Sequence, residues 1–177
     1  ISMHLSIDRY ADGYTMLEMA IVLVLLGILG ASAALRMTAV SQHDVLDQAD
    51  VLRRDIARVQ AIAMAQGVAL RLTAASSGYT VSCLTTASGT PCDAVGKILK
   101  DPATGSNVTV ALQNGVGLLA TDANGAAATV TDFDSLGRPW SGAALIASNP
   151  ARIFRLSAAS RTATVALRPI SGFTEVS

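Results

Sequence analysis

The sequence predicts an α+β fold in which one long N-terminal helix is followed by an antiparallel sheet. An apolar run from residue 19 to residue 35 is broken only by Ser32. An apolar stripe with helical spacing follows that run, and beyond residue 67 the chain changes to short alternating runs separated by turn residues. At 177 residues the chain can hold one modest domain and an extension.

Composition limits both the core and the partners. The chain has 13 basic and 13 acidic residues, so its zero net charge offers no general attraction to nucleic acid or anionic lipid. Hydrophobic residues make up 51% of the chain, but aromatic residues only 4%. The core must therefore be built mainly from alanine, valine and leucine.

The first expected element is a membrane-spanning helix. With residues 14–18 added, the apolar run reaches the roughly 20 residues that cross about 30 Å of hydrocarbon. The apolar core of a secretory signal is usually shorter, about 7–15 residues. Small residues at positions 31–34 nevertheless leave a signal-peptidase site open as an alternative.

Glu18 is the unusual residue of this segment. A carboxylate within a membrane span costs on the order of 2–3 kcal/mol, and the segment contains no basic side chain to pair with it. A cut after Gly13 would create an α-amine at Tyr14, four residues before Glu18. Proteolysis could therefore supply the missing positive charge.

The helix is expected to continue beyond the membrane. Apolar residues recur at steps of three and four, which places them on one helical face: Val45, Ala49, Leu52, Ile56, Val59 and Ala63. This pattern predicts one helix from about residue 15 to residue 66, with Gly67 as its stop. We expect the stripe to pack on the protein's own sheet, with a coiled coil as the alternative.

The remaining chain predicts strands. Residues 68–72 and 79–81 read as a hairpin around a turn at 76–78. Similar short runs occupy residues 107–112, 128–133, 152–156 and 163–167. They predict an antiparallel sheet, or two small ones, on the helix, while residues 93–105 and 114–125 are expected to be loops with uncertain strands.

The residues GYTMLE at 13–18, directly before the apolar run, resemble the class III signal of type IV prepilins and type II secretion pseudopilins. The resemblance implies a pilin fold and cleavage by a prepilin peptidase after Gly13. It also implies N-methylation of Tyr14 and a role for Glu18 in filament assembly.

The same resemblance implies a division of the chain. Residues 1–13 would be the leader peptide, and 14–36 the transmembrane and filament-core helix. Residues 37–66 would be an amphipathic stem, and 67–177 a β-rich periplasmic head. The expected location is the inner membrane, with a single pass, and then the filament.

Further segments narrow the resemblance. RRDIARVQAIAMAQGVALRL at 53–72 is similar to the H-type pseudopilins and their minor-pilin relatives of the GspH/FimT type. FDSLGRP at 133–139 and TVALRPISGF at 164–173 are similar to minor pilins of mannose-sensitive haemagglutinin systems. The implied role is a structural minor pilin or pseudopilin whose partners are other pilin subunits, the prepilin peptidase and the inner membrane.

Cys83 and Cys92 are the only cysteines. Two cysteines cannot form a structural zinc site without further ligands, and His4 and His43 lie in the leader and the stem. We therefore expect a disulfide, with free thiols as the alternative, and neither a metal nor a cofactor.

No catalytic set is apparent, so we expect no enzymatic activity. His43 has no identifiable nucleophile and acid beside it. Asp132 and Asp134 alternate along a predicted strand and turn, where carboxylates more often cap or solvate than catalyse.

The C-terminal part is basic, with five arginines after Asp134 against the single acid Glu175. Some FimT-like minor pilins bind DNA, so one alternative is a DNA-binding pilin that contacts phosphates through Arg152, Arg155 and Arg161. A simpler interpretation is that these arginines only keep the sheet soluble. A third alternative is a membrane-anchored periplasmic domain that never polymerises.

Overall fold

The structure is a computed structural model that describes residues 15–142 and 144–177, with the side chains of residues 30–43 outside the description. The expectations for the leader, Gly13 and Tyr14 therefore lie outside the described residues. The chain divides into two compact units, Ile1–Ala39 and Val40–Ser177. We describe each unit by itself.

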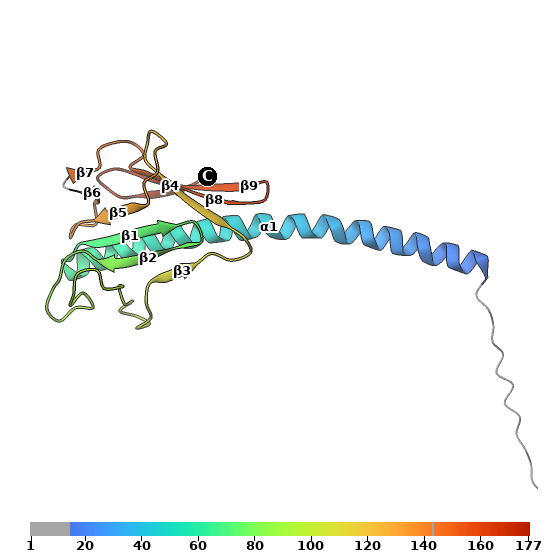
Figure 1. The fold of residues 1–177 in the computed structure, drawn as a ribbon, viewed down its shortest axis with the longest axis horizontal. Helices are drawn as coiled ribbons and strands as arrows, with labels where there is room; N and C mark the ends of the chain where they lie inside the picture. Colours follow the sequence, from blue (N-terminus) through green and yellow to red (C-terminus); the bar gives the residue numbers. More distant parts are fainter. Residues whose placement is uncertain (1–14, 143) are drawn as a thin grey trace, which may run out of the picture. The chain divides into compact units, whose positions relative to one another are not determined.

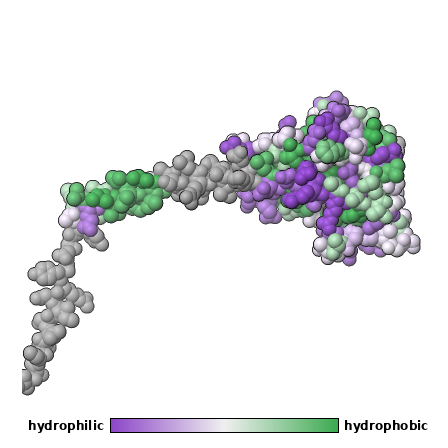
Figure 2. Space-filling model, turned by 180° about the vertical axis from the view of Figure 1, so that it is seen from behind, coloured by the Kyte–Doolittle hydropathy of each residue, from purple (hydrophilic) through white to green (hydrophobic). Residues whose placement is uncertain are grey.

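Helix α1 runs over Met16–Gln66 and contributes to both units. In the first unit, the large apolar side chains are exposed, from Met16 at 95% to Val22 at 44%. Figure 2 shows a mainly hydrophobic surface over residues 19–29, whereas hydrophobic and hydrophilic residues are mixed over the second unit. Among the residues whose side chains are described, no helical stretch is long and apolar enough to cross a membrane.

The last part of α1 carries the expected stripe. All six predicted positions, from Val45 to Ala63, are at most 1% exposed. The helix ends where Gly67 adopts a φ of 65°, and the Val68 N–H donates to the Ala63 carbonyl at 3.2 Å. Only glycine reaches this conformation without strain, so the predicted helix end is confirmed.

Within the described residues ten strands follow α1, and the pairings between them are antiparallel. The strands are β1 Leu70–Ala75, β2 Gly78–Cys83, β3 Thr109–Ala111, β4 Gly117–Thr121, β5 Val130–Phe133, β6 Pro139–Ser141, β7 Ala144–Leu145, β8 Arg152–Ala158, β9 Arg161–Leu167 and β10 Thr174–Val176. They form a six-stranded sheet, β3-β2-β1-β5-β6-β7, and a four-stranded sheet, β10-β9-β8-β4. The α+β prediction is confirmed, with two sheets.

Both sheets share one core with α1. The inward residues of β1 and β5, of β8 and β9, and of the helix stripe belong to a single cluster of buried side chains. Figure 1 shows strands of both sheets alongside the C-terminal part of α1. Phe133 and Phe154 are the largest fully buried side chains, and aliphatic residues fill most of the rest. The core is thus poor in aromatic residues, as the composition indicates.

Two local predictions need correction. The hairpin turn is Ser76-Ser77, and Gly78 instead opens β2 opposite Ala111. A side chain at Gly78 would overlap the Val110 carbonyl oxygen, so the close approach of β3 explains this glycine. The segment 114–125, expected to be a loop with uncertain strands, contains β4, which pairs with β8 in the four-stranded sheet.

Candidate functional site

The start of α1 positions Glu18. Thr15 precedes the helix, and the Glu18 backbone N–H donates to the Thr15 side-chain oxygen at 3.3 Å and to its carbonyl at 3.0 Å. Thr15 and Glu18 thus have the spacing of a capping box. Glu18 lies in the first turn, where the helix dipole and unpaired N–H groups favour a negative charge. This placement partly offsets the cost of a carboxylate in an apolar segment.

The residues after Glu18 form an apolar surface with little cover. The side chains of Leu23 and Leu29 are 70% and 66% exposed within their unit. An exposed apolar surface of this extent indicates contact with lipid or with other apolar helices. A pairing between Glu18 and the Tyr14 amine stays a prediction, because Tyr14 lies outside the described residues.

Cys83 and Cys92 form a disulfide, with their Cα atoms 5.5 Å apart. Both residues are at most 1% exposed. Cys83 ends β2. Its backbone N–H donates a hydrogen bond to the Lys97 carbonyl, and its carbonyl accepts one from the Gly96 N–H of the next loop. The bridge therefore fixes residues 84–91 against the end of β2.

Arg152 does not join a basic surface with Arg155 and Arg161. It is only 6% exposed and donates to the Ala151 carbonyl at 2.9 Å and to the Ser141 side chain at 3.1 Å, while burial lowers the pKa of its guanidinium. Because strand side chains alternate, Arg152 shares the inner face of β8 with Phe154, and Arg155 faces solvent. The burial of Arg152 disfavours the predicted phosphate contact through this residue.

The other C-terminal arginines include two that are paired. Arg138 forms an ion pair with Asp134 at 2.7 Å, and Arg168 forms one with Glu175 at 2.6 Å. Arg155 and Arg161 remain exposed. This arrangement reduces the positive potential available to DNA, and no observation favours the DNA-binding alternative.

Asp132 and Asp134 have structural partners. Asp132 is 2% exposed and accepts two hydrogen bonds from Arg71, at 2.7 and 2.9 Å. Asp134 accepts from the backbone N–H groups of Leu136 and Arg138 in the turn after β5. Burial opposes ionisation of Asp134, but hydrogen bonds from Arg138 and the turn lower its pKa. The capping role expected of these carboxylates fits Asp134, whereas the buried Asp132 forms an ion pair with Arg71, whose side chain is 40% exposed.

Three comparisons with known proteins bear on these observations. The family model described as the prokaryotic N-terminal methylation motif matches residues 8–34. A crystal structure of the type IV minor pilin FimU of Pseudomonas aeruginosa (strain PAO1) is similar at 11% identity, with a TM-score of 0.46, over 77% of this chain and 89% of that chain. No curated protein matches. The motif match confirms the resemblance to type IV prepilins at the N-terminal segment.

Proposed function

We propose that the chain is a structural, non-enzymatic subunit, a minor pilin or pseudopilin, of a type IV pilus or type II secretion pseudopilus. A prepilin peptidase cleaves it after Gly13 and methylates the amine of Tyr14. The observation that carries this proposal is the methylation motif over residues 8–34, which includes Gly13, Tyr14 and Glu18.

Glu18 guides assembly in this proposal. In the inner membrane its carboxylate is tolerated at the start of α1, and in the filament it pairs with the Tyr14 amine of a neighbouring subunit. A low dielectric strengthens this attraction, while the desolvation of both charges offsets part of it. Only a subunit whose amine reaches the carboxylate recovers the cost of burying Glu18, so the pair favours correctly placed subunits.

The head is built as one piece with the stem. Gln48 of α1 accepts from the Gln113 backbone N–H at 2.9 Å and donates to the Gln113 carbonyl at 3.2 Å. The Asn114 amide donates to Asp44 at 2.9 Å. These contacts fix the loop before β4 to the part of α1 that lies in the second unit. The disulfide fits a head on the oxidising, periplasmic side of the membrane.

N-terminal processing tests the proposal. The intact mass and N-terminal sequence of the membrane-extracted protein are measured with and without a co-expressed prepilin peptidase. We expect a chain that begins at Tyr14 and carries one added methyl group. Gly13→Leu should block the cut, whereas Gly27→Leu should not, because Gly27 lies within the apolar run and away from the cleaved bond. A chain that keeps residues 11–13, or one cut near residues 31–34, would contradict the proposal.

A further inference from the structure

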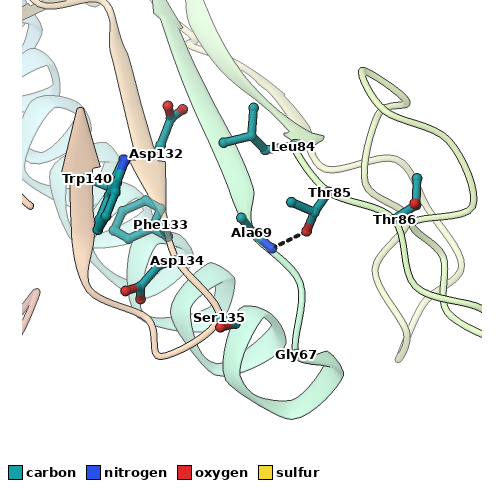
Figure 3. A pocket seen from close by; sticks show the side chains of 10 residues that line it. All are labelled: Gly67, Ala69, Leu84, Thr85, Thr86, Asp132, Phe133, Asp134, Ser135 and Trp140. Carbon is teal, nitrogen blue, oxygen red and sulfur yellow. Dashed lines mark hydrogen bonds between the residues drawn. The ribbon is translucent and has the colours of Figure 1, made fainter. Parts of the chain in front are cut away.

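The outer face of the six-stranded sheet carries a depression of about 490 Å³. It lies where β1 begins and where β2 and β5 end, with the small residues Gly67 and Ala69 among its lining. Figure 3 shows Trp140 of β6 on one side, and Leu84 and Thr85 on the other. Its volume falls within the range of small-molecule sites.

The only tryptophan of the chain forms one wall of this depression. Trp140 is half-buried. It does not belong to the core, although the core contains few aromatic residues. Its indole N–H donates to the Gly142 carbonyl at 2.7 Å, which fixes the ring. The polar atom of the indole is thus satisfied, and the ring offers an apolar surface to a ligand.

The polar part of the lining is rich in hydroxyl groups. Thr85 accepts from the Ala69 N–H at 2.8 Å and keeps its own proton for a ligand. The hydroxyls of Ser135 and Thr86 have no hydrogen-bond partner within residues 15–142 and 144–177. The two carboxylates at the site are each paired with an arginine, so the lining favours a neutral ligand over an ion.

The walls are also held in place before any ligand binds. The disulfide closes the segment that contains Leu84, Thr85 and Thr86, and the Leu84 N–H donates to the Ala69 carbonyl at 2.8 Å. On the opposite side, Trp140 pairs in register with Asp132 of β5. A fixed site loses less conformational entropy on binding than a flexible one.

We propose that this depression binds the ring of a neutral saccharide. A pyranose has one face of C–H groups and a rim of hydroxyl groups, and the site offers a matching pair of surfaces. The C–H face stacks on the negative face of the Trp140 ring. The sugar hydroxyls exchange hydrogen bonds with Thr85, Thr86 and Ser135.

Trp140 fluorescence tests this proposal, since every tryptophan signal of the chain comes from the site. The full chain, in a detergent without sugar headgroups, is titrated with the methyl glycosides of glucose, galactose, mannose and N-acetylglucosamine. Glycerol serves as a polyol without a ring. We expect a saturable change in emission with at least one glycoside and none with glycerol.

Variants separate the site from a general effect. Thr86→Ala and Ser135→Ala should each weaken binding roughly three- to tenfold, which is the loss of one hydrogen bond. Thr80→Ala, on the same sheet but outside the depression, should bind like the wild type. Ala69→Leu should remove binding by filling the depression, with the urea midpoint as the check on folding.

Three results would overturn the proposal. The first is no saturable response to any of the four glycosides. The second is an equal response to glycerol, and the third is binding that survives Ala69→Leu. If the first result comes with a response of Trp140 to another pilin subunit, the depression is assigned to subunit contact instead. None of these results depends on N-terminal processing or filament assembly.

Discussion

Gly78→Ala tests why β2 begins with glycine. An added Cβ would overlap the Val110 carbonyl oxygen and lie 3.2 Å from the Ala111 Cα. Both neighbours are backbone atoms of β3, so β3 must move away from β2. The two strands share three paired positions, beginning with Gly78 opposite Ala111. Loss of two or three backbone hydrogen bonds, each worth about 0.5–1.5 kcal/mol, predicts a destabilisation of roughly 1–4 kcal/mol.

Gly117→Ala is the matched control. Gly117 also opens a strand, but a Cβ there would lie 3.8 Å from the Ser157 and Ser76 carbonyl oxygens, an ordinary contact. Removing a glycine without strain reduces the entropy of the unfolded chain, so we expect a gain of about 0.4–1 kcal/mol.

Equilibrium unfolding in urea, followed by Trp140 fluorescence, measures both free energies. The two glycine variants should shift the stability in opposite directions. If Gly78→Ala is as stable as the wild type, or if both variants shift it the same way, the reasoning from the approach of β3 is refuted.

Three further predictions use the same unfolding assay. Leu52→Ala should lower the free energy of unfolding by about 2–5 kcal/mol because the Leu52 side chain is fully buried. Leu46→Ala should lower it by less than about 1 kcal/mol because Leu46 is 42% exposed. Equal losses would contradict the assigned helix face. Replacing both Cys83 and Cys92 by serine should lower the free energy of unfolding by about 2–3 kcal/mol, given their separation of 9 residues. Adding a reductant should not destabilise that variant further. Because folding lowers the pKa of Asp134, the ionised carboxylate stabilises the fold fully above its unfolded pKa, and this stabilisation is lost as pH falls through the folded pKa. The difference in unfolding free energy between the wild type and Asp134→Asn should therefore shrink below about pH 4. A difference that stays constant with pH would contradict this prediction.

The sequence was sufficient where one local pattern determined the structure. The helix end followed from Gly67, because only glycine readily takes the left-handed conformation there. The buried stripe followed from helical spacing, and Cys83 and Cys92 were the only candidates for a bridge. Each of these features depends on residue type and spacing within a short segment.

The remainder depended on contacts between distant segments. β4 pairs with β8, more than thirty positions later in the chain, so its own residues gave little indication of a strand. The role of Gly78 depends on β3, which no pattern at 76–78 could indicate. The ion pair of Arg71 with Asp132 arises from the register of β1 and β5.

The burial of Arg152 could have been predicted from the sequence. It alternates with Phe154 and Leu156, so strand periodicity places it on the inner face, whereas Arg155 falls on the outer face. Strand periodicity therefore separates Arg152 from Arg155, although the number of arginines alone does not.

The most direct test of the central claim is whether the chain enters a filament through Glu18. Filaments sheared from cells that produce the wild type, Glu18→Ala or the matched Glu175→Ala are analysed for this chain by mass spectrometry. We predict that all three chains are cleaved after Gly13, and that only Glu18→Ala is missing from the filaments. Normal incorporation of Glu18→Ala, or absence of the wild type from every filament preparation, would contradict the account.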